Sequence, residues 1–100
     1  MEYALLDEHL SYFTQEKFSD CIKHYAVPLY TVEKHVPKGS KDHSCAEYCI
    51  EHECDFITAD KKAFDEIFKL KKIKSIEIKQ ILEREPTIDR PVYSLSFRTK

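Results

Sequence analysis

The sequence predicts a single α/β domain built on a mainly parallel sheet. Through the first 70 residues, short β-prone runs alternate with segments whose apolar residues recur at helical spacing, which is the pattern of successive strand and helix units. The length of 100 residues suits one compact domain, and a composition of 42% apolar and 34% charged residues is that of a folded globule. Residues 1–100 are therefore expected to form one domain, with the last two strands pairing antiparallel at an edge.

A strand and then a helix are expected at the N-terminus. Residues 2–6 indicate a buried strand, which ends at Asp7 where the sequence becomes polar. Between residues 11 and 25 the apolar positions recur at helical spacing, and Thr14 is positioned to be the N-cap.

Residues 26–41 predict an edge strand and a linker. The run 26–32 is β-prone, but Pro28 lacks an amide donor, which places this strand at an edge. The linker contains Pro37 and Gly39, and Gly39 is the only glycine in the chain. A single glycine argues against glycine-rich phosphate loops and dinucleotide fingerprints, so nucleotide cofactors of those two kinds are not expected.

A second helix is expected to begin at Asp42. Ala46, Cys49 and Ile50 share one face of that helix and form a buried stripe. The simplest role of Asp42 is that of an N-cap, because a carboxylate satisfies free amides and complements the helix dipole there.

Residues 54–70 predict a strand, an acid and a helix. The apolar strand 54–58 stops before Asp60, and helical spacing resumes from Lys61 to Leu70. Asp7 also follows a strand, so if the two strands are parallel neighbours both acids lie at one sheet edge, where open α/β sheets bind their ligands. Facing carboxylates repel each other unless a cation lies between them, and the sequence therefore predicts a site for Mg²⁺ or Mn²⁺.

The C-terminal part of the chain predicts two further strands. Lys71–Lys74 is a basic turn, and residues 73–81 alternate as a strand. A loop with Pro86 is expected over 83–90, before a last strand over 91–99. An exposed final strand favours pairing with a second copy, so a homodimer is one expected assembly.

Charge is divided unevenly along the chain. Residues 1–60 carry 5 Lys/Arg and 12 Asp/Glu, a charge of −7, and residues 61–100 carry 11 and 6, a charge of +5, which together make the net −2. The acidic part suits a metal and the basic part suits phosphate, although single lysines commonly only solvate a surface. We expect RNA contacts from four lysines of the basic part: Lys61, Lys62, Lys71 and Lys72.

Three acidic motifs stand in a characteristic order. They are LLDEHL at residues 5–10, GSKD at residues 39–42 and FITADK at residues 56–61. In order and spacing these motifs resemble the PIN domain superfamily, and most closely its small members of about this length; the likeness covers residues 3–68. The resemblance implies a three-layer α/β/α fold around a central, mostly parallel sheet, with residues 1–100 as a single PIN-like domain.

The resemblance also implies an activity and a site. PIN proteins typically hydrolyse RNA phosphodiester bonds with Mg²⁺ or Mn²⁺, and many are toxins paired with an antitoxin protein, so the expected function is that of a metal-dependent endoribonuclease. Asp7, Asp42 and Asp60 match the acids that bind the metal and carry catalysis. Glu8 follows the first acid and is a further candidate ligand, although neighbouring strand residues point to opposite faces.

The chain departs from the PIN pattern at two positions. His9 stands where the pattern has Asn, and Lys62 stands where it has another acid, for which Asp65 is the nearest substitute. A site with only three matching acids leaves a second interpretation open, a catalytically inactive PIN-like binding or regulatory module.

Four cysteines add two further alternatives. Cys45, Cys49 and Cys54 lie close in sequence to His43 and His52, which permits a zinc site, but structural zinc sites usually combine pairs of closely spaced ligands on turns. A thiol redox function would require an exposed cysteine of low pKa, and the chain has no Cys-x-x-Cys motif. Free, buried thiols are therefore the expected state.

No segment of the sequence suggests a membrane or an export signal. Nothing approaches 18 or so consecutive apolar residues, and the N-terminus has no basic region followed by an apolar run. The expected location is the cytoplasm.

Overall fold

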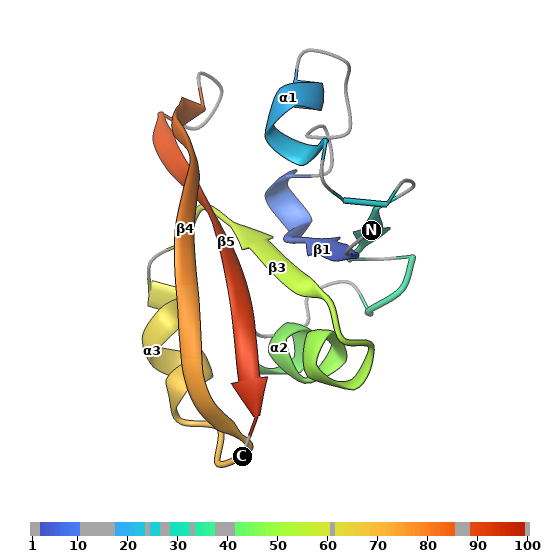
Figure 1. Ribbon diagram of the computed structural model, residues 1–100, viewed down its shortest axis with the longest axis vertical. Coiled ribbons are helices and arrows are strands. Elements are labelled where there is room, and N and C mark those ends of the chain that lie inside the picture. Colours follow the sequence, from blue (N-terminus) through green and yellow to red (C-terminus); the bar gives the residue numbers. More distant parts are fainter. Residues whose placement is uncertain are drawn as a thin grey trace.

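A computed structural model describes residues 3–10, 18–23, 25–26, 29–32, 34–37, 42–60, 62–85 and 89–99, with the backbone alone at residues 42, 62–64 and 85. Five strands and three helices lie in this part of the chain (Figure 1). In chain order they are β1 (Ala4–Leu6), α1 (Ser19–Ile22), β2 (Tyr30–Thr31), α2 (Asp42–Glu51), β3 (Asp55–Thr58), α3 (Lys62–Phe68), β4 (Ile73–Glu85) and β5 (Arg90–Thr99).

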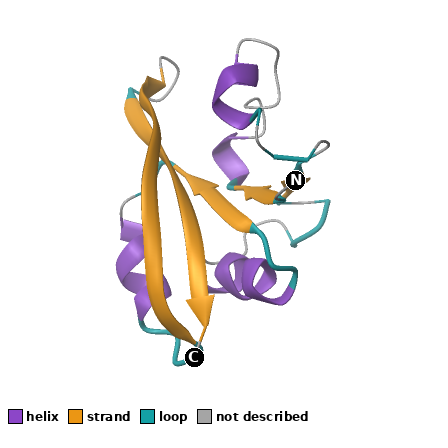
Figure 2. Cartoon of the chain, in the orientation of Figure 1, coloured by secondary structure: helices purple, strands orange, loops and turns teal. Residues whose placement is uncertain are grey.

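The strands form one mixed sheet in the order β2-β1-β3-β5-β4 (Figure 2). β1 is parallel to both β2 and β3, and Leu5 lies opposite Tyr30 on one side and Phe56 on the other. β5 is antiparallel to β3 and β4, and Leu95 lies opposite Phe56 and Ile78. The parallel pairs thus hold the N-terminal half of the sheet and the antiparallel pairs hold the C-terminal half.

The expectation of a three-layer α/β/α fold with a mostly parallel sheet is wrong. The sheet is mostly antiparallel, because β4 and β5 form a long hairpin while the parallel strands β1 and β2 have only 3 and 2 residues. Strands joined by a short turn need no crossover helix, so residues 73–99 fold back directly on each other. The expected loop at 83–90 is shorter than predicted, since β4 continues to Glu85.

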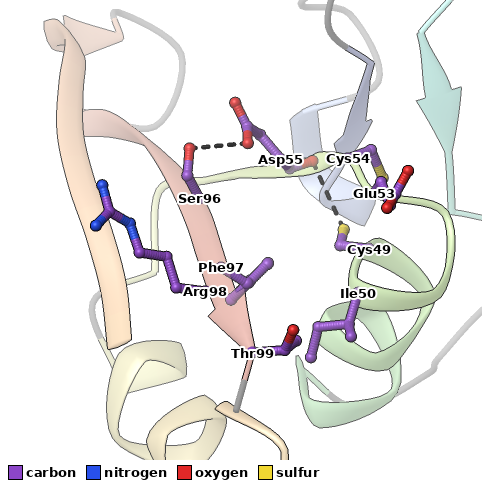
Figure 3. Close-up of a pocket in the computed structure, with 9 residues that line it drawn as sticks. All are labelled: Cys49, Ile50, Glu53, Cys54, Asp55, Ser96, Phe97, Arg98 and Thr99. Atoms are coloured by element: carbon purple, nitrogen blue, oxygen red, sulfur yellow. Dashed lines mark hydrogen bonds between the residues drawn. The ribbon is translucent and has the colours of Figure 1, made fainter. Parts of the chain in front are cut away.

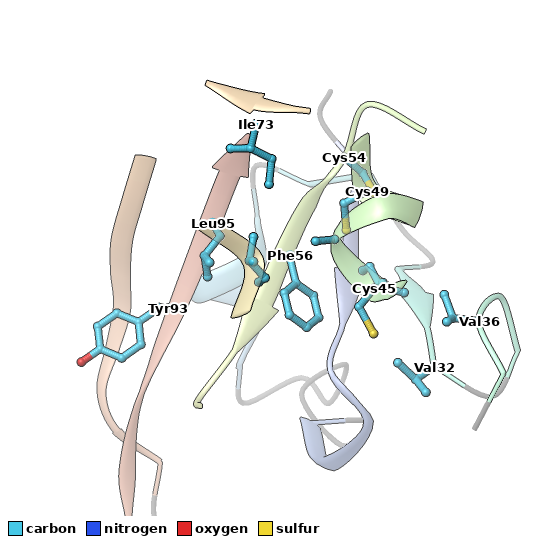
Figure 4. Close-up of a cluster of buried hydrophobic side chains, with 12 residues drawn as sticks. Val32, Val36, Cys45, Cys49, Cys54, Phe56, Ile73, Tyr93 and Leu95 are labelled. Carbon is cyan, nitrogen blue, oxygen red and sulfur yellow. The ribbon is translucent and has the colours of Figure 1, made fainter. Parts of the chain in front are cut away.

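The central strands β1 and β3 are buried on both faces. Phe56 lies in a cluster under α2 and α3 (Figure 4), to which Leu5 also belongs. Leu6 and Ile57 belong to a second cluster with Ile22 of α1. All four strand residues have no exposed surface. Burying a side chain of this size fully is worth roughly 1.5–3 kcal/mol, so both faces contribute to holding the sheet.

The two edges of the sheet are β2 and β4. The final strand is expected at an edge, where a second copy could pair with it. It is instead an interior strand, because β5 lies between β3 and β4. Aromatic rings pack beside β2: Tyr30 stacks on Tyr3 with centroids 5.7 Å apart and meets the edge of Tyr48 at 5.7 Å. Among the described residues, no helix is long and apolar enough to cross a membrane.

Most expected elements appear with shifted ends. The helix expected from Lys61 to Leu70 is α3, and the strand expected over 26–32 is the short β2. Of the helix expected between 11 and 25, α1 is the described part, and Thr14 with residues 11–17 lies outside the described residues.

Candidate acidic site

Two of the predicted acids follow neighbouring parallel strands. β1 ends at Leu6 and β3 ends at Thr58, and the amide of Asp7 extends their ladder by donating to the carbonyl of Ile57 at 2.9 Å. Asp7 and Asp60 are therefore at the same end of the sheet, as the sequence predicted.

A buried hydroxyl connects the two acids. Thr58 Oγ1 donates to Asp7 Oδ2 at 2.6 Å and accepts from the amide of Asp60 at 3.1 Å. Thr58 has no exposed surface, and its branched side chain suits a strand. The short hydrogen bond to a charged oxygen fixes the rotamer of Asp7, while the longer one fixes the backbone that carries Asp60.

Asp7 is held from several directions. Its side chain is 12% exposed, and Oδ1 accepts a hydrogen bond from the amide of Glu8 at 2.8 Å. Its carbonyl accepts from the amide of Leu10 at 2.9 Å, which closes the turn at residues 8–10. His9 lies near it, with Nδ1 3.9 Å from Oδ2. Each carboxylate oxygen of Asp7 has two lone pairs and accepts one of the two short hydrogen bonds, from Glu8 or from Thr58. Each oxygen therefore keeps one lone pair with which to bind a cation.

The oxygen donors at this edge fit Mg²⁺ or Mn²⁺. Mg²⁺ is usually held by one or two carboxylates together with water and substrate phosphates, which matches the pair Asp7 and Asp60. Asp60 is half-buried. Within the described part of the chain, no group of three His, Cys, Asp or Glu side chains is placed to hold a metal. The described residues thus show one fixed carboxylate, that of Asp7, with the backbone of Asp60 held beside it.

The other predicted acids have different positions. Asp42 is the first residue of α2, which runs antiparallel to β3, so this helix begins toward the end of the sheet where β1 and β3 finish (Figure 1). The side chain of Asp42 is outside the described residues. Asp65 is exposed in the first turn of α3, and Glu8 is exposed in the turn after β1.

The structure separates two of the predicted RNA-binding lysines from these acids. Lys71 and Lys72 are exposed in the turn before Ile73, which lies opposite Thr99, whereas Thr58 lies opposite Tyr93. Six residues of strand span roughly 20 Å, so this turn is at the other end of the sheet.

The other two predicted lysines lie near the start of α3. Lys62 is the first residue of that helix and follows Asp60 closely in the chain, but its side chain is not described. Lys61 lies outside the described residues.

A cavity lies at the end of the sheet opposite the acidic pair. It has a volume of about 410 Å³ and opens between the C-terminal end of α2 and the last residues of β5 (Figure 3). Asp7 and Asp60 are absent from its lining. The lining residues come from α2, β3 and β5, and they are Cys49, Ile50, Glu53, Cys54, Asp55, Ser96, Phe97, Arg98 and Thr99.

Asp55, on the cavity wall, is the functional candidate that sequence reasoning missed. Its Oδ2 accepts from the Tyr25 hydroxyl at 2.7 Å and its Oδ1 accepts from Ser96 Oγ at 2.8 Å. Tyr25 is 2% exposed, and its hydroxyl oxygen also lies 2.5 Å from Ser94 Oγ. This network ties the segment around Tyr25 to β3 and β5. The sequence feature that indicates this network is the spacing of Ser94 and Ser96, which places two hydroxyl groups on one face of the last strand.

The four cysteines are free thiols. Burial raises the pKa of Cys49 well above its ordinary value, with smaller contributions from a hydrogen bond to Cys54 and from nearby acidic groups, and burial also raises the pKa of Cys21. A thiol of raised pKa is a poor nucleophile at neutral pH, and this agrees with the expectation of free, buried cysteines. The thiols of the described residues do not join a three-ligand metal group, so the zinc alternative gains no support.

No protein-family model, curated protein or solved structure matches this chain. The resemblance to PIN proteins therefore depends on the three acidic motifs alone. Of these motifs, the first and third supply Asp7 and Asp60, which the sheet brings to one edge.

Proposed function

We propose that this chain is a divalent-metal-dependent ribonuclease whose site is the edge formed by Asp7 and Asp60. The observation that carries the proposal is the Thr58 hydroxyl, which bonds to the side chain of one acid and to the backbone of the other. Evolved metal sites hold their ligands by such outer contacts, because a fixed ligand loses less freedom when the ion binds. The PIN-like motifs add the reaction class, hydrolysis of RNA phosphodiester bonds.

Each residue of the edge has a role in this proposal. Asp7 and Asp60 hold the cation through carboxylate oxygens, Thr58 orients Asp7, and Asp42 is the third acid that the motifs imply. A bound Mg²⁺ or Mn²⁺ supplies Lewis acidity and lowers the pKa of a bound water. Lys62, at the start of α3, is the predicted lysine closest in sequence to the acids and is the one we assign to the RNA backbone.

The partners follow from the same proposal. RNA is the substrate, the cytoplasm is the compartment, and an antitoxin protein is the partner that the resemblance implies. A homodimer would form through β4 or β2 rather than through the final strand, because only those two strands lie at the edges of the described sheet.

Calorimetric titration of Mn²⁺ into metal-free protein tests the site. We expect one binding event in the wild type and its loss in both Asp7→Asn and Asp60→Asn, since each variant keeps the shape of the side chain and removes its charge. Glu77→Gln is the matched control, because Glu77 is exposed on β4, pairs with Arg98 and lies opposite Ser96, on the side of Tyr93 that leads away from the acidic edge. This control should bind Mn²⁺ like the wild type.

Cleavage of labelled single-stranded RNA then tests the activity. Activity that requires Mn²⁺ or Mg²⁺, disappears with a chelator and falls at least 100-fold in Asp7→Asn is the expected result. Metal binding without cleavage would instead support the regulatory module. Absence of Mn²⁺ binding in the wild type would contradict the proposed site altogether.

A further inference from the structure

The C-terminal end of α2 brings Cys49 and Cys54 together. The amide of Cys54 donates to the carbonyl of Cys49 at 2.9 Å, and the amide of Glu53 donates to the carbonyl of Ile50 at 3.4 Å. Glu53 between them is in the left-handed region, with φ 53°. These features define a Schellman motif, in which the side chains that occupy the positions of Cys49 and Cys54 regularly contact each other.

The spacing of the two cysteines suits a disulfide. A direct backbone hydrogen bond joins the two residues, and a disulfide requires Cα atoms no more than about 6.8 Å apart, so the close approach of the two backbones favours this pairing. The Cys49 thiol points toward this turn, since it donates to the carbonyl of Asp55, the residue after Cys54, at 3.6 Å. Both cysteines are only 1% and 5% exposed, but both line the 410 Å³ cavity, which is their route to a small reagent (Figure 3).

We propose that Cys49 and Cys54 form an oxidation site that takes a hydroperoxide and closes as an intramolecular disulfide. Cys54, the more exposed of the two, attacks the peroxide as its thiolate, so the O–O bond breaks, an alcohol or water leaves, and Cys54 becomes a sulfenic acid. Burial raises the pKa of Cys49 and weakens it as a nucleophile, but the helix end holds it beside Cys54, so the second step is intramolecular. The sulfur of Cys49 then attacks the sulfenic sulfur, the S–O bond breaks and water leaves. The two thiols lose two electrons and two protons in total, and the hydroperoxide takes up both.

The other cysteines are less suited to this reaction. Cys45 lies four residues before Cys49 on the same helix, and the rigid α-helical backbone holds both in place. Cys21 belongs to α1 and packs with the cluster on the other face of the sheet. The site therefore predicts one disulfide among the six pairings that four cysteines allow.

Peptide mapping after treatment with excess hydrogen peroxide tests the proposal on the wild-type protein. A glutamate-specific protease separates the four cysteines into different peptides, with Cys49 in residues 48–51 and Cys54 in residues 54–66. We expect the intact protein to lose the mass of two hydrogen atoms, these two peptides to be linked, and dithiothreitol to reverse both changes. The same treatment in denaturing urea should yield mixed pairings, because the helix end is then absent.

Single variants check the assignment. Cys21→Ser and Cys45→Ser should still form the linked peptide, whereas Cys49→Ser and Cys54→Ser should not. Linkage through Cys45 or Cys21 in the native wild type, or oxidation to sulfinic acid without linkage, would overturn the proposal. Because mapping of the wild type alone decides the pairing, a variant that fails to fold leaves the test intact.

Discussion

At the scale of single residues, the acidic edge depends on one buried side chain. Thr58 is fully buried at the end of β3, and its hydroxyl satisfies one oxygen of Asp7 and the amide of Asp60. A buried polar group without a partner costs about 1–3 kcal/mol, so this hydroxyl supports the fold as well as the proposed site. Asp7 has a comparable double role, since its backbone also closes the turn at residues 8–10.

Thr58→Val should reveal both roles of the hydroxyl. Valine keeps the branched shape but removes both hydrogen bonds, so the free energy of unfolding should fall by about 1–3 kcal/mol and Mn²⁺ affinity should fall about tenfold or more. Thr58→Ser is the matched control, because it keeps the hydroxyl and loses one methyl group, which costs stability but not metal affinity. Urea denaturation and calorimetry measure the two effects; equal Mn²⁺ affinity in both variants would show that Thr58 does not orient the site.

At the scale of elements, the end of α2 and the start of β3 form one unit. The Schellman motif stops the helix, sets Cys54 against Cys49 and delivers Asp55 to the first position of β3, where it joins Tyr25 and Ser96. The motif places Glu53 at a positive φ that a residue with a Cβ adopts at a cost. The cavity and the thiol pair therefore share one structural origin, the way in which this helix ends.

Glu53→Gly should stabilise the protein, because glycine adopts the left-handed region without the steric cost. We expect the free energy of unfolding to rise by about 1 kcal/mol. Glu47→Gly is the matched control: Glu47 is exposed within α2, and the same substitution there should lower stability by about 1 kcal/mol. Thermal or urea denaturation of the two variants should show opposite signs, and a loss of stability in Glu53→Gly would contradict the assigned role of Glu53.

At the scale of the whole molecule, one sheet joins two clusters of buried side chains. Neighbouring residues of β1 point to opposite faces, with Leu5 in the cluster under α2 and α3 and Leu6 in the cluster with α1. The long β4–β5 hairpin completes both clusters through Leu95 on one face and Val92 on the other. Neither face is dispensable, because the same three central strands support both.

Leu5→Ala and Leu6→Ala should therefore destabilise the molecule to a similar extent. Each substitution leaves a cavity in a fully buried cluster and should cost about 2–5 kcal/mol, a large share of the 5–15 kcal/mol or so that a domain of this kind has. Ile78→Ala is the control, since Ile78 is 44% exposed on the edge strand and should cost less than about 1 kcal/mol. Urea denaturation measures all three; a negligible loss in only one β1 variant would show that its cluster is not part of the cooperative core.

The sequence by itself determined where most strands and helices lie and which acids follow the strands. Apolar runs identified β1 and β3, helical spacing identified α2 from Asp42, and alternation identified β4 and β5, because burial imposes these local patterns on a chain. Asp7 and Asp60 were likewise predicted from their places after two apolar runs, and the parallel pairing of β1 and β3 brings them together.

Only the tertiary structure decided how the strands pair and what lies at each end of the sheet. The antiparallel pairing of the last two strands is expected from the sequence and confirmed. Alternation states which face a side chain occupies but not which strand lies beside it, so the insertion of β5 between β3 and β4, which makes the sheet mostly antiparallel, is absent from the sequence pattern. The same pairing placed Lys71 and Lys72 at the end opposite Asp7 and Asp60, and it brought Asp55 to Tyr25 and Ser96. The hydrogen bonds of Tyr25 join residues 30 and 69 positions apart in the chain. Such contacts depend on which strands are neighbours, and a local sequence pattern does not contain that information.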